Sequence, residues 1–336
     1  MMFTICRNVL TAALLAGLLS PLAAQRGGGG VRVNLGTVVP KDSAWYEVLV
    51  RMKQDWATIS SGRVDLRIYP GGSLGDDVEM LRKVRIGQLQ AVAVTSVGLS
   101  RIDDSIEALH TPMLFGSYEE LDYVREKMAP KLEAALNQKG FVVLNWSDGG
   151  WAQFFTKKPA KTLDDIRGMK LWIGTGDPKA EQLYRDFDMR PTPLPMTEML
   201  TALQTGLIEA IDVPPLFAML DGSFQRAPFM TDIRWAPVMG GTVISKEAWE
   251  RIPADLRPKL LASAKKAGEE MRGRIRQLGE DSIAQMKQRG LTVVSADREA
   301  WQREVEAAYP KMRGKLAPAA LFDEAIRLRD EYRAKR

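Results

Sequence analysis

The sequence contains almost no cysteine or histidine. Its 336 residues include one of each, Cys6 and His110. Because Cys6 lies in an N-terminal segment that we expect to be removed, the mature chain would have no disulfide framework, no cysteine-based metal site and no cysteine nucleophile. A Ser-His-Asp triad would require His110, and no nucleophile motif lies near it. These absences argue against hydrolytic chemistry, and we expect no metal and no cofactor.

The sequence also lacks an apolar run long enough to span a membrane. Its longest N-terminal run, Val9–Leu19, follows the positive charge of Arg7 and precedes small residues that end at Ala24. This pattern is typical of a cleavable secretory signal, here residues 1–24. The glycine spacer Gly27–Gly30 disfavours the alternative of a buried N-terminal helix. We therefore expect a protein exported to the periplasm.

No strong charge of one sign marks a nucleic-acid surface. The formal net charge is +5, and basic residues alternate with acidic ones, as in Arg327–Glu331. Such mixed runs are usually solvated helix faces, so we expect no nucleic-acid partner. The roughly 310 residues that follow the signal exceed the usual size of one hydrophobic core, which predicts two domains. We expect a monomer.

The first part of the chain reads as alternating strands and helices. Strands are predicted at residues 31–39, 64–68 and 91–94, with a helix after Asp42 or Ser43 and another after Asp76. Asp76 and Glu79 form a capping-box pattern at the start of the second helix. The βαβαβ order predicts a parallel sheet covered by helices on both faces.

The segment Leu163–Pro215 repeats this pattern as strand, helix, strand, helix, strand with short connections. Asp177 and Pro178 begin one helix, and Gly206 ends the other. Open α/β sheets place their ligands at the carboxyl ends of such strands. We therefore expect the ligand to be bound here.

Three further segments organise the domains. Trp146–Phe155 is interpreted as a crossover, because it is too long and too rich in glycine for a simple strand. Phe224–Gly241 is expected to return the chain to the first domain. Pro253–Gln288 predicts a helix on the order of 50 Å long that spans both domains. We assign residues 31–150 and about 236–265 to a first lobe and residues 151–235 and about 280–336 to a second, with the helix at 253–289 shared.

Five motifs in order resemble one protein family. They are Ile68–Gly75, Leu89–Ser96, Thr111–Phe115, Leu163–Lys170 and Met196–Gly206, and they resemble the solute-binding subunits of tripartite ATP-independent periplasmic (TRAP) transporters, the DctP family. The resemblance implies an α/β, two-lobed periplasmic-binding-protein fold with a central ligand cleft. It also implies a small-molecule solute, a membrane permease as partner, and no chemical step.

The residues that the resemblance implies for ligand binding are replaced. An arginine that pairs with a ligand carboxylate is common in the strand after Gly-Met-Lys, and this position is Trp172. An asparagine near the end of a later strand corresponds to Val213, and an aromatic residue corresponds to Met196. A second cationic position falls on Ala152 or Gln153.

These replacements allow two interpretations. Trp172 can point into the core while Arg85 or Arg101 meets the ligand charge, or the cleft can have changed its chemistry. Because a carboxylate in an apolar cleft loses its hydration, we hypothesise a neutral or largely apolar solute that stacks on Trp151 and Trp172. An organic acid bound by other cations, or a binding protein that serves a sensor, stays open as an alternative.

Polar residues at strand ends complete the predicted site, although Asp76 is already explained as a helix cap. The paired acids at residues 76–77 and 164–165 could suggest a glycosidase, but they lie at helix starts, where acids are favoured. The predicted ligand-binding residues are Trp172, Trp151, Gln153, Met196, Val213, Thr95, Ser96, Asp148, Asp76 and Phe217.

Overall fold

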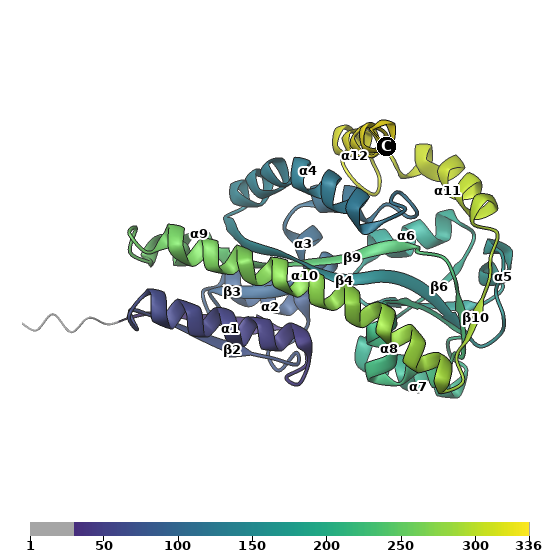
Figure 1. The fold of residues 1–336 in the computed structure, drawn as a ribbon, viewed down its shortest axis with the longest axis horizontal. Helices are drawn as coiled ribbons and strands as arrows, with labels where there is room; N and C mark the ends of the chain where they lie inside the picture. The colour runs from purple at the N-terminus through teal and green to yellow at the C-terminus, as the bar shows by residue number, and fades with distance from the viewer. Residues whose placement is uncertain (1–29, 336) are drawn as a thin grey trace, which may run out of the picture.

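The fold consists of two groups of strands and helices joined by long strands and one long helix (Figure 1). The structure is a computed structural model that describes residues 30–335. The predicted signal peptide at residues 1–24 lies outside the described residues.

The first lobe begins as predicted, with β1 (Val31–Thr37), α1 (Ala44–Ile59), β2 (Val64–Tyr69), α2 (Asp77–Arg85) and β3 (Ala91–Thr95). Strand β1 pairs in parallel with both β2 and β3. The side chain of Ser43 caps α1, and that of Asp76 caps α2 by accepting a hydrogen bond from the backbone of Glu79 at 2.8 Å. The chain continues through α3 (Ser96–Ile102), the 3-10 helix η1 (Asp104–His110) and α4 (Tyr118–Gln138).

The segment interpreted as a bent crossover is part of one continuous strand, β4 (Phe141–Thr156). The prediction of a crossover was correct, but the exclusion of a strand was wrong. Register shifts between Val143 and Asn145 and between Asp148 and Gly150 bend β4 without ending it, as β-bulges do. Strand β9 (Ala236–Ser245) runs antiparallel to β4 and returns to pair with β3.

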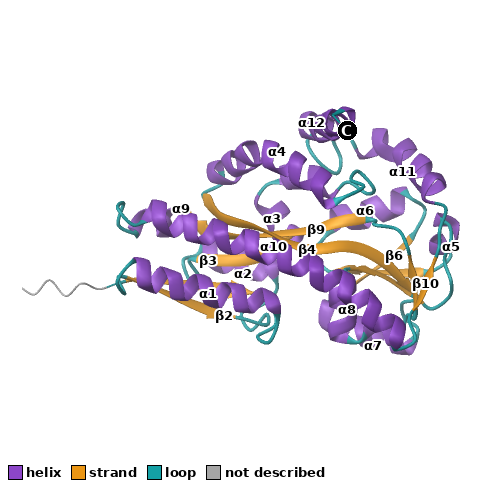
Figure 2. Ribbon diagram, viewed as in Figure 1, coloured by secondary structure: helices purple, strands orange, loops and turns teal. Residues whose placement is uncertain are grey.

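The second lobe contains a second parallel sheet segment. It comprises α5 (Leu163–Arg167), β5 (Lys170–Gly174), α6 (Pro178–Asp186), β6 (Arg190–Leu194), α7 (Met196–Thr205), β7 (Ala210–Val213), α8 (Pro215–Asp221), η2 (Ser223–Gln225) and β8 (Phe229–Thr231). Strand β5 pairs in parallel with β6 and β7, while β4 pairs antiparallel to β7. The main sheet order is β2-β1-β3-β9-β4-β7-β5-β6. Figure 2 shows the strands in orange and the helices that cover them in purple.

The predicted spanning helix is α10 (Arg257–Gln288), which follows the short α9 (Lys246–Arg251). It begins a few residues later than predicted and contacts α1, β4 and α8, so it lies along both lobes (Figure 1). Its buried face includes Leu260, Ala264, Met271, Ile275 and Met286.

The last elements are shared between the lobes. After β10 (Thr292–Val294), α11 (Arg298–Met312) packs on the second lobe, where Trp301 donates a hydrogen bond to the Lys161 carbonyl at 2.8 Å. In contrast, α12 (Ala319–Ala334) packs on α4, where Lys131 and Glu324 form an ion pair at 2.6 Å. Assigning all of residues 280–336 to the second lobe was therefore wrong for α12.

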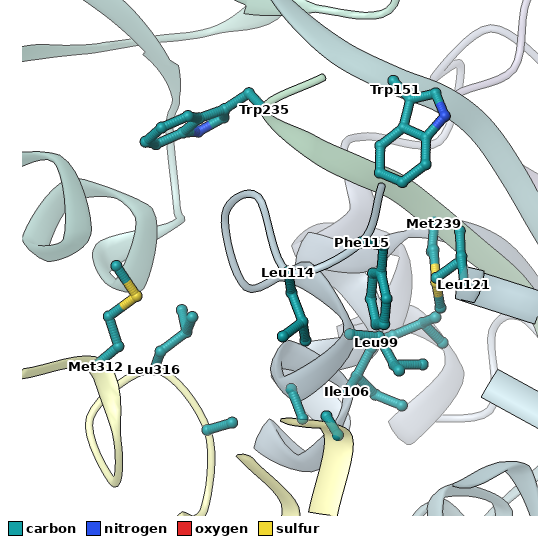
Figure 3. Packing of buried hydrophobic residues seen from close by; sticks show 14 of the residues in the cluster. Leu99, Ile106, Leu114, Phe115, Leu121, Trp151, Trp235, Met239, Met312 and Leu316 are labelled. Carbon is teal, nitrogen blue, oxygen red and sulfur yellow. The ribbon is translucent and has the colours of Figure 1, made fainter. Parts of the chain in front are cut away.

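Apolar side chains fill the space between these layers. Figure 3 shows one part of the core, where Phe115 packs near Leu99, Leu121 and Met239 and below Trp151. A second core fills the space between α1, α10 and the first sheet, and a third lies under α7 and α8. Trp151 thus belongs to the core that reaches the middle of β4.

Helix α10 packs closely on β4 at Gly268. A Cβ atom on this residue would lie 2.6 Å from the Trp146 carbonyl oxygen and 2.7 Å from the Asn145 Cβ. We expect Gly268→Ala to lower the free energy of unfolding by about 1–3 kcal/mol, because the added methyl group would push the helix away from the strand. Chemical denaturation of the purified variant measures this change.

Gly273, in the same helix, provides the matched control. A Cβ atom there would meet no other atom within 4 Å. Gly273→Ala should therefore raise stability, by up to about 1 kcal/mol, because alanine favours helix more than glycine does. Equal effects of the two substitutions would contradict the close packing of α10 on β4.

Candidate functional site

The carboxyl ends of the two sets of parallel strands meet at the middle of β4. We call this region the lobe junction and define it by Thr95–Asp104, Asp148–Gln153, Gly174–Asp177 and Val213–Pro215. Gly150 lies against Pro214 at the end of β7, and the end of β3 pairs with β9 beside β4. The junction is thus where open α/β sheets place their ligands.

The two lobes also contact each other directly at this junction. The guanidinium group of Arg101 donates a hydrogen bond to the Gly176 carbonyl. Lys179, at the start of α6, forms an ion pair with Asp104, in which Nζ lies 2.9 Å from Oδ2. Both contacts join the α3–η1 segment of the first lobe to the start of α6 in the second.

Trp172 is a core residue in this arrangement. Its side chain is 6% exposed and belongs to the cluster under α7 and α8. The indole Nε1 donates a hydrogen bond to the Leu194 carbonyl at 3.1 Å. The first of the two interpretations, in which Trp172 points into the core, therefore describes the structure.

Gln153 and Val213 lie side by side, since they are direct cross-strand partners on β4 and β7. Val213 is buried in the same cluster as Trp172. Gln153 is also buried, but it lines a small cavity. Of these two predicted site residues, Gln153 lines the cavity, whereas Val213 contributes to the core of the second lobe.

Trp151 forms part of the same cavity, which has a volume of about 70 Å³. Its ring is tilted by 35° against that of Tyr118 at a centroid separation of 5.2 Å, and the Arg234 guanidinium carbon lies 5.9 Å from the Trp151 ring centroid. Among the described residues, the buried Trp151 Nε1 has no hydrogen-bond partner. The cavity therefore combines aromatic faces with hydrogen-bond donors.

Asp148 has a structural role. Its Oδ1 accepts a hydrogen bond from Arg125 at 3.1 Å, and its Oδ2 accepts one from Arg276 Nε at 2.8 Å. Arg276 also pairs with Asp122 at 2.7 Å. Burial opposes the charge on Arg276, but the hydrogen bonds and charges of these two acids outweigh it and raise the Arg276 pKa.

Thr95 and Ser96 lie at the junction, as predicted, at the end of β3 and the start of α3. The Thr95 hydroxyl and backbone N–H both donate to Oδ2 of Asp77, a residue that the site prediction omitted. Burial raises the pKa of Asp77, and these two hydrogen bonds only partly oppose the effect. The neighbouring Asp76 is exposed and acts as the cap of α2.

The two remaining predicted residues lie on the second lobe. Met196 is 50% exposed at the start of α7. Phe217 is partly buried in α8 and packs against the same core as Trp172.

A partly buried acid, Asp212, precedes Val213 on the opposite face of β7. Tyr184 donates a hydrogen bond to its carboxylate, and Trp235 Nε1 donates to the Tyr184 oxygen at 3.0 Å. Burial raises the pKa of Asp212 to about 7, although the hydrogen bond from Tyr184 opposes the shift. The charge of Asp177 raises it further.

Sequence reasoning missed Tyr118, Arg234 and Arg276, which line the cavity with Trp151. Arg276 follows Ile275, one of the buried apolar residues of α10. A cation next to the buried face of this helix could have indicated that Arg276 lies near the site. Arg234 lies in an irregular segment between two buried residues, where no periodicity points to it.

The part of the chain that the structure describes has neither a metal-binding cluster nor a membrane-spanning helix. Within residues 30–335, no group of three or more His, Cys, Asp or Glu side chains could hold a metal ion. The helices of this part of the chain are all too short or too polar to cross a membrane. His110 lies beside Glu107, with Nδ1 and Oε2 3.4 Å apart.

Comparison with known proteins gives a consistent result. The sequence model of the bacterial extracellular solute-binding proteins of family 7 matches residues 35–315. The C4-dicarboxylate-binding periplasmic protein DctP of Rhodobacter capsulatus is 25% identical over 262 residues, which cover 75% of this chain and 78% of that protein. The 2,3-diketo-L-gulonate-binding periplasmic protein YiaO of Escherichia coli is 26% identical over 250 residues, 72% of this chain and 74% of that protein.

A solved structure gives the same fold. The TRAP periplasmic solute-binding protein of Chromohalobacter salexigens, determined with bound D-glucuronate, superposes with a TM-score of 0.81. It is 19% identical, and the match covers 89% of this chain and 99% of that one. The two-lobed α/β periplasmic-binding-protein fold is thereby confirmed.

The buried position of Trp172 predicts the effect of restoring an arginine there. Trp172→Arg should lower the free energy of unfolding by roughly 3–5 kcal/mol, because it places an unpaired charge in an apolar core. Trp172→Phe keeps most of the volume and should cost less, about 1–3 kcal/mol for the lost hydrogen bond. Thermal and chemical denaturation of both variants would distinguish the two effects. A Trp172→Arg protein as stable as Trp172→Phe would place residue 172 in the cleft.

The raised pKa of Asp212 predicts a pH dependence of stability. The unfolded chain loses this proton near pH 4, whereas the folded protein keeps it until about pH 7. Because the folded state binds more protons in this range, the free energy of unfolding should fall as the pH rises from 4 to 7. Asp212→Asn should flatten that dependence. Denaturation curves of both proteins across this range test the expectation, and parallel curves would contradict it.

Proposed function

Because the chain belongs to family 7 of the bacterial extracellular solute-binding proteins, we propose that it captures a small organic acid between its two lobes and delivers it to a TRAP-type membrane permease. Proteins of this family bind small solutes and work with membrane permeases. The observation that carries the proposal is the match of the family model over residues 35–315, which includes both lobes and the junction between them.

The expectation of a neutral or apolar solute is not supported. Two relatives are named for the acids that they bind, and the Chromohalobacter structure holds D-glucuronate. The physical basis for the expectation also fails, because Trp172 and Val213 contribute to the core of the second lobe and so say nothing about the solute. The alternative of an organic acid bound by other cations fits these findings better.

A role without chemistry fits the junction. Its most buried acid, Asp148, is paired with the bases Arg125 and Arg276. We propose that the protein works in the periplasm, reached through the signal predicted at residues 1–24, and that binding alone is its function. The monomeric state stays a prediction.

The proposal predicts selective stabilisation by acids. We expect D-glucuronate or succinate to raise the melting temperature of the purified mature protein, whereas D-glucose, a neutral analogue, leaves it unchanged. A ligand present at 100 times its dissociation constant stabilises a protein by about 2.7 kcal/mol, which is readily measured. The test is a thermal-shift titration with sugar acids, C4-dicarboxylates and their neutral counterparts. Stabilisation by neutral solutes alone would refute the assignment to organic acids.

A further inference from the structure

We propose that Arg234 pairs with the carboxylate of the bound solute in the cavity that it shares with Trp151 and Gln153, an assignment that rests on the proposed function. With Trp172 buried in the core, β5 offers no cation to the junction. A carboxylate taken from water needs a charged hydrogen-bond donor in its place, and a guanidinium group provides two in a fork.

The cavity lies where an acid held between the lobes would be enclosed. Its walls come from the start of α4 at Tyr118, from the middle of β4, from the start of α8 at Pro214 and from the second half of α10. Both lobes and the connecting elements thus contribute to one space. A volume of about 70 Å³ suits an anionic group rather than a whole sugar acid.

Four other cations near the junction are already engaged. Arg125 and Arg276 are held by Asp148. Arg101, one of the two arginines first considered for this role, donates to the Gly176 carbonyl. The other, Arg85, donates a hydrogen bond to the Arg101 carbonyl at 3.1 Å and lines a separate cavity of about 310 Å³ near Phe141, at the start of β4. Lys179 pairs with Asp104 and donates to the Leu316 carbonyl.

Arg234 keeps hydrogen-bonding capacity. Its Nη1 donates to the Gly116 carbonyl at 3.1 Å, and its Nη2 forms an ion pair with Glu280 at 3.7 Å, which is beyond hydrogen-bond distance. The Arg234 side chain is 35% exposed. Two exposed acids, Glu280 and Asp232, line the cavity and compete with an incoming carboxylate.

The backbone of Arg234 is fixed by its neighbours. Ile233 and Trp235 are both buried, and the Trp235 N–H donates to the Ala152 carbonyl at 2.9 Å. The guanidinium group lies near the face of Trp151, which itself packs against Tyr118. Such support holds the donor in place before the acid arrives, which lowers the entropic cost of binding.

Because Glu280 competes with the solute for Arg234, substitutions of these two residues should change the affinity for the acid in opposite directions. Arg234→Gln should weaken the binding of D-glucuronate or succinate by about 10- to 100-fold, as expected for loss of a charged hydrogen-bond pair. Glu280→Gln should strengthen it about two- to five-fold, because it removes an exposed competitor for Arg234. Arg226→Gln, an exposed arginine in the same connecting segment, is the matched control and should leave the affinity unchanged.

Calorimetric titration of the mature wild-type protein and these variants with the two acids measures the affinities, and melting curves establish that each variant is folded. If Arg234→Gln fails to fold, Arg234→Lys should still weaken binding, because lysine keeps the charge but lacks the fork. Wild-type affinity in a folded Arg234→Gln or Arg234→Lys protein, or weaker binding by Glu280→Gln, would overturn the assignment and leave organic-acid binding intact. A wild-type protein that binds no organic acid would refute the proposed function and the assignment together.

Discussion

The buried carboxylate of Asp148 joins the elements that form the lobe junction. It accepts hydrogen bonds from Arg125 on α4 and from Arg276 on α10, and its own backbone carbonyl accepts one from Trp45 on α1 at 3.2 Å. Removing one partner from a buried ion pair leaves a charge without compensation, which is strongly unfavourable. The three helices are thus bound to one point on β4. The Arg276 guanidinium carbon also lies 4.1 Å from the Tyr118 ring centroid, so the same cluster positions a wall of the cavity.

The core of the second lobe explains why solute recognition must use another element. Trp172 fills the space under α7 and α8, and its indole N–H is engaged by the Leu194 carbonyl. An arginine there would face apolar neighbours such as Leu203. In our proposal, the charge of the solute is met by Arg234, which enters the junction from the segment that returns the chain to the first lobe.

The sequence predicted those features that depend on local physical rules. Ser43 caps α1, Gly206 adopts the left-handed conformation that ends α7, and the apolar stripe of α10 is buried as its spacing indicates. Features that depend on tertiary partners were not predictable. The pattern of α12 showed that one face is buried but not that α4 covers it. The sequence did not predict β4 as one strand, because its β-bulges interrupt the alternation of inward- and outward-facing side chains by which a strand is recognised.

The site was predicted less completely for a related reason. A residue near the end of a strand can face the core or the ligand, and the identity of Trp172 fitted both. Mass spectrometry of the solute retained by the purified protein tests the central claim most directly. Our account predicts the mass of a small carboxylic acid, released when the protein is unfolded. Retention of a neutral solute alone would contradict it.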